Sequence, residues 1–373
     1  MSMSMSYVAS AEATEEERTP DSRPGSVYCI EPLQDCRWDA FVQKHPRASI
    51  FHSGAWLTAL SRSYAYKPVA YTTSPAGQEL ENSVVFCQVE SWLTGRRLVS
   101  LPFSDHCEPL VDAPADLVVI SLALEEESRC GRWRYIEMRP LKAVEMLASL
   151  PQVTVPYTFH QLDLLPDLKV LFRNCHKNST QRKILRAERE GLQYREGSTA
   201  ELLNCFYRLH TLTRKRHKRP PQPRKWFVNL MDCFGANLKI RVAFKDDRPV
   251  AAVLTIVYKD TLVYKYGGSD SRFNKLGGMH LLLWRAIQEA KAAGLGFVDF
   301  GRTDEDQQGL VTFKKRWGSK QSNLTYSRYG LMCNTGHIFE SYFLNGKCSA
   351  ARQLLTHMPG FTLLGRALYR HVG

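Results

Sequence analysis

Residues 261–300 read TLVYKYGGSDSRFNKLGGMHLLLWRAIQEAKAAGLGFVDF, and this stretch decides the fold. Thr261–Tyr266 has the pattern of a strand, a loop with four glycines follows, and Met279–Ala293 has the apolar spacing of a helix. Phe297–Phe300 is a second short apolar strand. A strand, a glycine loop, a helix and a strand in this order are typical of an α/β fold that can bind an anion at the head of the helix.

The same order of elements is expected twice along the chain. After a linking helix over 167–190, the second half, residues 166–334, is expected to run strand, two helices, three strands, helix, strand, helix, strand. The first half, residues 27–165, repeats this order without visible sequence identity. The repeat predicts an α/β protein of tandem duplicated domains, each with a mixed sheet flanked by helices.

The two ends of the chain differ from the body. Residues 1–26 are polar and acidic, and they are expected to form a disordered tail. The whole chain carries a net charge of +13, and this tail is negative, so the remainder is strongly basic and favours an anionic partner. Residues 335–373 are expected to form a helical extension of apolar residues interspersed with arginines. This extension can pack on the body or rest peripherally on a membrane.

The cysteines indicate a reducing compartment. The chain has ten cysteines and no Cys-x-x-Cys pair. Free thiols in apolar stretches are typical of a cytoplasmic protein, which is the expected location, with the inner membrane as a peripheral alternative. Zinc sites need paired ligands at short spacing, so no metal site is expected.

Four strings resemble the FemAB-like and CelD-like branch of the GNAT acyltransferases. They are IFHSGAW at 50–56, SWLTGRRLVSLPF at 91–103, NSTQRKILRAEREG at 178–191, and DFGRT at 299–303 with FKKRWG at 313–318. The resemblance covers about residues 38–330. It implies tandem GNAT-like domains, the acyl-CoA N-acyltransferase fold, and transfer of an acyl group to an amine by the second domain.

The resemblance leaves the acyl donor open. Members found with exopolysaccharide and cell-envelope genes imply acyl-CoA, such as acetyl-CoA, as a co-substrate rather than a permanently bound cofactor. Relatives that build peptidoglycan cross-bridges use aminoacyl-tRNA and often carry a coiled-coil insert, but residues 213–224 in its place are short and lack heptads. The leading expectation is therefore acyl-CoA-dependent acylation of an amine on an envelope or exopolysaccharide precursor or an amino acid.

Two alternatives remain beside this expectation. The first is an aminoacyl-tRNA-dependent transferase of the FemAB type, with tRNA as a partner. The second is a non-catalytic GNAT-like scaffold that binds an anionic glycan or a lipid carrier. The oligomeric state is not indicated by the sequence.

The glycine loop before the helix is the candidate donor site. Glycine lets a phosphate approach the backbone, and the free N–H groups at the head of a helix favour an anion. The alternative is a glycine turn that only leads into the helix. The equivalent loop of the first half, residues 101–109, has no glycine, which places the donor in the second half. The expected donor-binding residues are Arg272, Asn274, Lys275, Gly277 and Gly278.

Three charged residues near the end of the next strand are candidates for catalysis. Asp299 ends the strand where ligands of α/β folds tend to bind, and its carboxylate can accept a proton from an amine. Arg302 and Lys314 can hold an anionic acceptor or stabilise a tetrahedral oxyanion. In the alternative, these two cations hold Asp299 in a structural ion pair.

Six residues are candidates for acceptor binding, each with a structural alternative. They are Ser53, Trp56, Asp105, His106, Tyr264 and Tyr266. The serine and the tryptophan can instead cap and anchor a helix, and the Asp-His pair can be loop structure. The two tyrosines alternate onto one face of a strand, which is either core or cleft.

Basic residues are densest between Arg214 and Lys225. Most such runs are solvated faces. The alternative is contact with an anion, such as the 3′-phosphate of coenzyme A, the end of a tRNA or a sugar phosphate.

Overall fold

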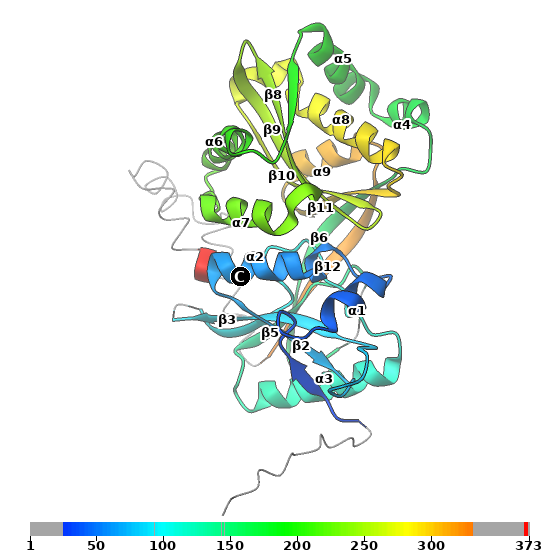
Figure 1. The fold of residues 1–373 in the computed structure, drawn as a ribbon, viewed down its shortest axis with the longest axis vertical. Coiled ribbons are helices and arrows are strands. Elements are labelled where there is room, and N and C mark those ends of the chain that lie inside the picture. The colour runs from blue at the N-terminus through cyan, green and yellow to red at the C-terminus, as the bar shows by residue number, and fades with distance from the viewer. Residues whose placement is uncertain (1–24, 93, 143, 145, 331–368, 372–373) are drawn as a thin grey trace, which may run out of the picture.

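The computed structural model describes residues 25–92, 94–142, 144, 146–330 and 369–371 (Figure 1). Most of the expected acidic tail and helical extension lies outside these residues. Within them, twelve strands form one continuous sheet. The strands are β1 (Tyr28–Ile30), β2 (Lys67–Thr72), β3 (Val84–Ser91), β4 (Gly95–Val99), β5 (Tyr135–Met138), β6 (Gln152–Asp163), β7 (Gln193–Gly197), β8 (Leu238–Lys245), β9 (Arg248–Tyr258), β10 (Thr261–Ser269), β11 (Phe297–Asp304) and β12 (Lys320–Tyr329).

Helices cover both faces of this sheet. They are α1 (Trp38–Lys44), α2 (Gly54–Tyr64), α3 (Pro114–Arg129), α4 (Leu168–Asn174), α5 (Arg182–Arg189), α6 (Ala200–Arg216), α7 (Arg224–Phe234), α8 (Gly278–Ala292) and α9 (Gln308–Lys315). In the second half, α6 packs on β9 and β10, and α8 packs on β8 and β9 with α5 against it. Figure 1 shows α6 and α8 on opposite sides of these strands. No helix in the described ranges is long and apolar enough to cross a bilayer.

The duplicated order is visible in the strand pairing. Across the sheet the order is β1-β2-β3-β4-β5-β12-β6-β11-β10-β9-β8-β7. Each half contains one parallel pair, β4 with β5 and β10 with β11, and a long helix connects the two strands of each pair. The expected tandem α/β architecture is therefore confirmed.

The two halves exchange their last strands. β6 comes from the first half but pairs with β11, with Leu162 opposite Val298. β12 comes from the second half and pairs with β5, with Ser327 opposite Met138. β6 and β12 also pair with each other, all of β12 lying opposite residues 152–161 of β6, so the halves share one sheet and not only a linker.

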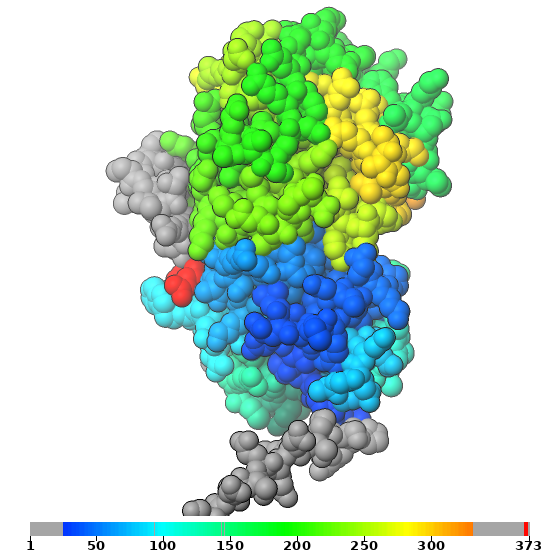
Figure 2. Space-filling model, in the orientation of Figure 1, coloured from blue at the N-terminus to red at the C-terminus, as the bar shows by residue number. Residues whose placement is uncertain are grey.

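A shared apolar core around α2 and α7 also joins the two halves. α2 and α7 lie against each other between the two halves (Figure 1). The rings of Trp56 and Trp226, both fully buried, meet edge to face at 5.3 Å between centroids. Figure 2 shows the halves meeting along a continuous seam on the face drawn. Burial of such large aromatic surfaces fixes the halves against each other.

Two expected helices differ in the structure. The linking segment 167–190 is not one helix, because Cys175 is extended between α4 and the π-helical turn Lys177–Gln181 that precedes α5. The side-chain amide of Gln181 donates to the carbonyl oxygens of Phe172 and Cys175, which satisfies the end of α4. Between β5 and β6, the described residues of 141–150 form turns and not the expected helix.

Candidate active site

The parallel strands β10 and β11 separate shortly after they begin to pair. Their pairing ends at Val263 opposite Asp299, yet β10 continues to Ser269 and β11 to Asp304. Beyond that point, alternate N–H and C=O groups on the open edge of β10 point toward the gap. A cavity of about 960 Å³ opens there, between the two strands, α6 and α9.

At the parallel pair of the first half, the loop after β4 lies against the end of β5. The loop after β4 is bound to the end of β5, since Cys107 N donates to Arg139 O at 2.7 Å. Arg139 Nη1 in turn donates to Leu101 O at 2.8 Å. The cavity described above lies at the parallel pair of the second half.

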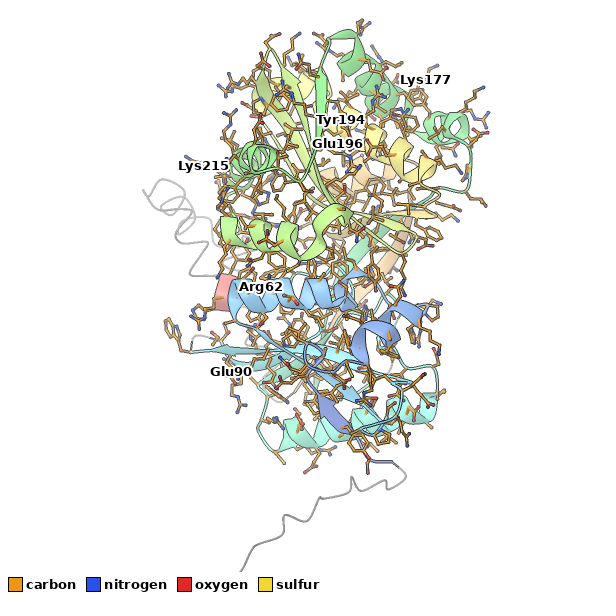
Figure 3. The ribbon with its side chains drawn as sticks, in the orientation of Figure 1. Arg62, Glu90, Lys177, Tyr194, Glu196 and Lys215 are labelled. Atoms are coloured by element: carbon orange, nitrogen blue, oxygen red, sulfur yellow. The ribbon has the colours of Figure 1, made fainter. Side chains whose placement is uncertain are left out.

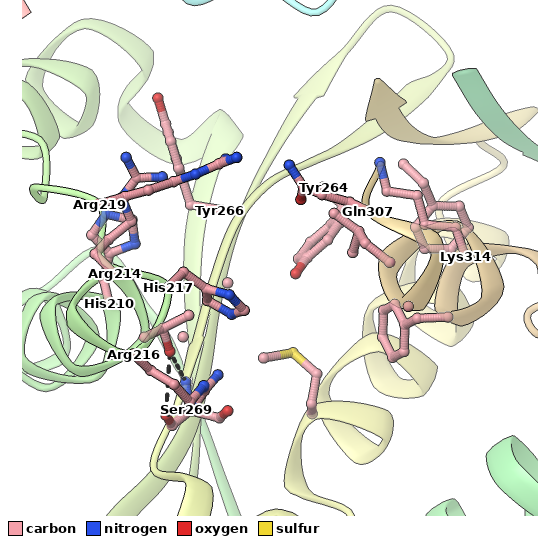
Figure 4. A pocket seen from close by; sticks show the side chains of 18 of the residues that line it. His210, Arg214, Arg216, His217, Arg219, Tyr264, Tyr266, Ser269, Gln307 and Lys314 are labelled. Carbon is pink, nitrogen blue, oxygen red and sulfur yellow. Dashed lines mark hydrogen bonds between the residues drawn. The ribbon is translucent and has the colours of Figure 1, made fainter. Parts of the chain in front are cut away.

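The cavity has two chemically different walls (Figure 4). One wall is cationic and comes from the end of α6 and the following loop, with Arg214, Arg216, His217 and Arg219. Neither Arg214 nor Arg216 has a carboxylate partner among the residues that the structure describes. The opposite wall is mainly apolar and comes from β10, α8, β11 and α9, with Tyr264, Met279, Phe300, Leu310 and Phe313.

Asp105 reaches this cavity from the first half. Its carboxylate accepts from Lys265 Nζ at 2.6 Å and lies against the backbone of Gly301 in β11. Gly301 has φ of +69°, and a Cβ there would lie 2.9 Å from Asp105 Oδ2, so only glycine allows this approach. Burial opposes ionisation of Asp105, but Lys265, Arg302 and Lys314 outweigh it and hold its pKa below the usual value.

Lys265 lines the cavity and was not among the residues that the sequence indicated. Its side chain is 5% exposed and lines the cavity between the two predicted tyrosines. The ammonium lies 5.0 Å from the ring centroid of Phe51 and 5.5 Å from that of Trp56. Burial lowers the pKa of Lys265, and Asp105 partly offsets the shift. The aromatic rings and Asp105 therefore hold a cation at the floor of the cavity.

Lys314 is buried in the wall formed by α9. Its Nζ donates to Gly301 O at 2.9 Å and to Arg302 O at 2.8 Å. An ammonium has three donors, and the third has no partner within the described part of the chain, so it is available to a ligand in the cavity. Burial lowers the pKa of Lys314 to about 8, against the opposing effect of Asp105 and Asp299.

Arg302 connects the two walls. Its guanidinium stacks on the rings of Tyr157 and Tyr326, at 4.3 Å and 4.9 Å from their centroids. Asp304 bonds Arg302 at 3.3 Å and Arg219 of the cationic wall at 3.2 Å. A planar cation held by two rings and a carboxylate is a fixed part of the site.

Asp299 lies behind the cavity and does not line it. It is 3% exposed, accepts from Gly301 N at 2.5 Å, and lies 3.2 Å from His106 Nε2. The alternative in which Arg302 and Lys314 hold Asp299 in an ion pair is wrong, because Lys314 bonds carbonyl oxygens and Arg302 pairs with Asp304. The cause is a bulge in β11 between Asp299 and Gly301, which changes the direction of the carboxylate.

His106 packs as a buried ring beside Asp105. It is 7% exposed and lies edge to face with Phe51 and Phe159. Its Nδ1 atom has no hydrogen-bond partner in the described structure. The predicted pair therefore divides, with Asp105 in the cavity wall and His106 behind it.

The glycine turn before α8 is used for packing. A Cβ on Gly277 would lie 2.2 Å from Lys183 O of α5, and a Cβ on Gly278 would lie 3.1 Å from Ala251 Cβ. Arg272 is exposed and pairs with Asp270 at 2.6 Å. Asn274 lines the large cavity, whereas Arg272, Lys275, Gly277 and Gly278 do not. Gly278 instead borders a smaller, adjoining cavity of about 190 Å³ with Lys183 and His280, and both cavities are lined by Asn274 and Met279.

Gly277→Ala is expected to destabilise the protein. The residue has φ of +82°, where an L side chain costs about 1–2 kcal/mol before any overlap is counted. The overlap with Lys183 O adds to this cost because a backbone atom must move. Thermal unfolding should therefore show a lower midpoint for the variant. Gly309→Ala is the matched control, because no atom lies within 4 Å of its Cβ and alanine favours a helix. Equal midpoints for the two variants would contradict the packing role.

The remaining candidates divide between cap, core and cavity. Ser53 Oγ accepts from Trp56 N at 3.2 Å, so the serine is a helix cap as its alternative proposed. Trp56 is a core anchor that also supports Lys265. Tyr264 and Tyr266 both line the cavity, and Tyr266 Oη accepts from Trp226 Nε1 at 2.9 Å. Burial raises the pKa of Tyr264 to about 12.

The dense basic run forms both a wall and a surface. Arg214, Arg216 and Arg219 line the cavity, whereas Lys215 lies on the outer side of α6 (Figure 3). His217 carries a pKa below its usual value, because burial and the neighbouring arginines disfavour its charge. His210, which the sequence did not indicate, also lines the cavity, and its buried ring lies with Nε2 2.8 Å from Gln222 Oε1.

Comparisons with known proteins support the fold seen here. Residues 175–315 match the model of a family described as an acetyltransferase (GNAT) domain. A UDP-N-acetylmuramoylpentapeptide-lysine N(6)-alanyltransferase from Weissella viridescens is 28% identical over 158 residues, which is 41% of this chain and 46% of that protein. The chain thus matches less than half the length of this curated relative.

Solved structures are similar over most of the chain. FemX superposes with a TM-score of 0.63 at 15% identity, covering 84% of this chain and all of that one. L-PGS from Bacillus licheniformis gives 0.52 at 13% identity over 92% of this chain and 98% of its own. A tandem GNAT protein from the clavulanic acid biosynthesis pathway gives 0.50 at 9% identity over 81% and 97%. At such identities the likeness concerns the fold, which is a tandem GNAT arrangement.

Proposed function

We propose that the chain is an aminoacyltransferase of the FemAB type, which moves an aminoacyl group from aminoacyl-tRNA to an amine of a cell-envelope precursor. The observation that carries the proposal is the cavity between β10 and β11. It joins a cationic wall to an apolar wall, with Lys314 and Asp105 facing the same space. Acyl transfer needs a cation that stabilises the oxyanion formed during the reaction, and a group nearby that accepts a proton from the amine.

The cationic wall supports a polyanionic donor. Arg214 and Arg216 lack carboxylate partners in the described residues and would neutralise phosphates at the end of an RNA. The partial relative from W. viridescens is named as an alanyltransferase, which supports an aminoacyl group. A coiled-coil arm is not required by this geometry, since the cavity wall itself supplies the cations.

Acyl-CoA is the alternative donor, and specific observations favour it too. The match to a GNAT acetyltransferase domain and the separation of β10 from β11 are both typical of proteins that bind an acyl-CoA. Against it, the backbone of Lys183 fills the space above Gly277, where a pyrophosphate would approach. We therefore rank aminoacyl-tRNA first.

The geometry supports a direct transfer. The amine nitrogen attacks the acyl carbonyl carbon, the C–N bond forms, and negative charge develops on the carbonyl oxygen near Lys314 Nζ. Asp105 accepts the proton that the nitrogen loses, and the C–O ester bond then breaks. Asp105 returns the proton to the departing ribose oxygen. A carboxylate of low pKa suits this role because the nitrogen becomes strongly acidic only after the attack.

The charge of the cavity also limits the acceptor. Two carboxylates, Asp105 and Asp306, line the cavity against six cations, so an acceptor that carries a carboxylate or phosphate beside its amine is favoured. The six cations are Arg214, Arg216, Arg219, Lys265, Arg302 and Lys314. Peptidoglycan and exopolysaccharide precursors both meet this description. A cytoplasmic reaction, with or without peripheral contact with the inner membrane, is part of the proposal.

A parallel donor assay tests the proposed function. The purified protein is incubated with an amine-bearing envelope precursor and either a pool of ¹⁴C-aminoacyl-tRNAs or ¹⁴C-acetyl-CoA. Label is expected to move to the acceptor from the tRNA pool, faster than hydrolysis in a reaction without protein. Transfer only from acetyl-CoA would replace the first donor with the second. Transfer from neither donor, across a panel of precursor amines, would contradict the enzyme proposal.

A further inference from the structure

The segment Tyr369–His371 is held between the two halves by groups from both. From the first half, Tyr66 Oη donates to Tyr369 O at 2.7 Å, and Arg97 Nη2 donates to His371 O at 2.7 Å. Thr94 Oγ1 donates to the same His371 oxygen at 3.0 Å. These bonds fix the backbone of the segment against β4, the turn before it and the residue that precedes β2.

The side chain of Tyr369 points into the second half. It is 3% exposed and packs against Phe103 at 5.7 Å between ring centroids. Its hydroxyl accepts from Arg214 Nη2 at 2.6 Å and donates to Pro220 O at 3.0 Å. The Tyr369 hydroxyl therefore contacts both α6 and the loop that follows it.

Arg214 is held from two directions by this arrangement. Its Nε donates to Pro220 O at 3.1 Å, the same oxygen that accepts from Tyr369. The carbonyl and the phenol are neutral, so they orient the guanidinium without cancelling its charge. A cation held by neutral partners keeps its charge for a ligand.

The same contact reaches a second cation of the wall. Pro220 directly follows Arg219, which lines the cavity and pairs with Asp304. Fixing Pro220 O therefore fixes the backbone from which Arg219 projects. Through one hydroxyl, a segment distant in sequence sets the position of two cavity arginines.

We infer that Tyr369 is a positioning residue for the cationic wall of the cavity and that its hydroxyl orients Arg214 toward an anionic ligand. The inference depends on the proposed function in one respect, because it takes the ligand to be a polyanion such as the end of a tRNA. Without the hydroxyl, Arg214 has a wider range of orientations, and binding loses the advantage of a fixed donor.

The inference is tested on the full chain by measuring how tightly it binds bulk tRNA that carries no aminoacyl group. Binding is followed by fluorescence anisotropy at fixed salt. Tyr369→Phe keeps the ring and removes the hydroxyl, and it is expected to raise Kd about three- to tenfold. Arg214→Met is expected to raise Kd at least as much. The double variant should bind no more weakly than Arg214→Met, because the hydroxyl acts through that arginine.

Tyr207→Phe is the matched control. The Tyr207 hydroxyl donates to Gln222 O at 3.2 Å in the same loop, and no contact joins it to Arg214 among the bonds found in the described chain. It should bind tRNA like the wild type. Wild-type affinity in Tyr369→Phe, or losses that multiply in the double variant, would overturn the inference.

Hydrogen exchange separates failure of this inference from failure of the proposed function. Amides of residues 214–219 are expected to exchange faster in Tyr369→Phe than in the wild type, with no ligand present. If the wild type does not bind tRNA but this exchange increases, the proposed donor is wrong and the positioning role stands. If exchange is unchanged, Tyr369 does not position the wall, whatever the donor is.

Discussion

Lys314→Met is expected to lower the rate constant of acyl transfer by about 10²- to 10³-fold, the usual cost of removing one group that stabilises an oxyanion. The methionine retains most of the apolar volume in α9 but removes the ammonium whose third donor faces the cavity. Binding of the donor should change much less than the rate constant, because the oxyanion exists only in the transition state and the intermediate. Single-turnover kinetics measure the two separately.

The ratio of wild-type rate to Lys314→Met rate should depend on pH. Burial lowers the pKa of Lys314 to about 8, so the ammonium is present below that pH and is lost as pH rises through it. The ratio is therefore expected to be largest below pH 8 and to fall above it. Taking a ratio cancels the titration of the acceptor amine, which both proteins share. A ratio that rises through pH 8 would show that neutral Lys314 acts as a base instead.

Lys315→Met is the control for this prediction. Lys315 is the next residue of α9 and is exposed to solvent. Its loss should leave the rate constant unchanged. Equal losses in the two variants would mean that the charge of the helix matters and that no specific contact of Lys314 does.

Asp105→Asn is expected to lower the rate constant by about 10²-fold or more, because the amide cannot accept the proton of the attacking amine. Asparagine has nearly the same shape as aspartate, so the side chain can still lie against Gly301. Stability should fall as well, since Lys265 loses the carboxylate that bonds it at 2.6 Å within a buried site. The rate must therefore be measured below the unfolding temperature of the variant.

Asp112→Asn is the control on the same half of the protein. Asp112 is exposed and pairs with Arg47 at the surface, where an ion pair contributes little. The rate constant should not change. If Asp105→Asn retains the wild-type rate constant while Asp299→Asn does not, the proton acceptor is the residue that the sequence first indicated.

Much of the fold could be predicted from the sequence, but the exchange of β6 and β12 could not. Alternation of apolar residues shows which face of a strand is buried, whereas the partner of a strand is decided by the whole sheet. The prediction of one continuous helix over the linking segment 167–190 was wrong for a local reason. Its basic and apolar spacing fits a helix, but Thr180 and His176 bond Arg316 O beside the break.

The candidate site was predicted in part. Arg302, Lys314, Asp105, Tyr264 and Tyr266 all line the cavity. Lys265 was missed because strict alternation places it on the face opposite its two tyrosine neighbours. The bulge between Tyr264 and Tyr266 breaks that alternation and brings the lysine into the cavity wall.

The most direct test of the account is a crystal structure with a short RNA that carries a 3′-aminoacyl group through a hydrolysis-resistant amide. The account predicts that the carbonyl oxygen of this group lies about 3 Å from Lys314 Nζ, with the terminal phosphate against Arg214. An acyl group bound outside the cavity between β10 and β11, or pointing away from Lys314 and Asp105, would contradict it.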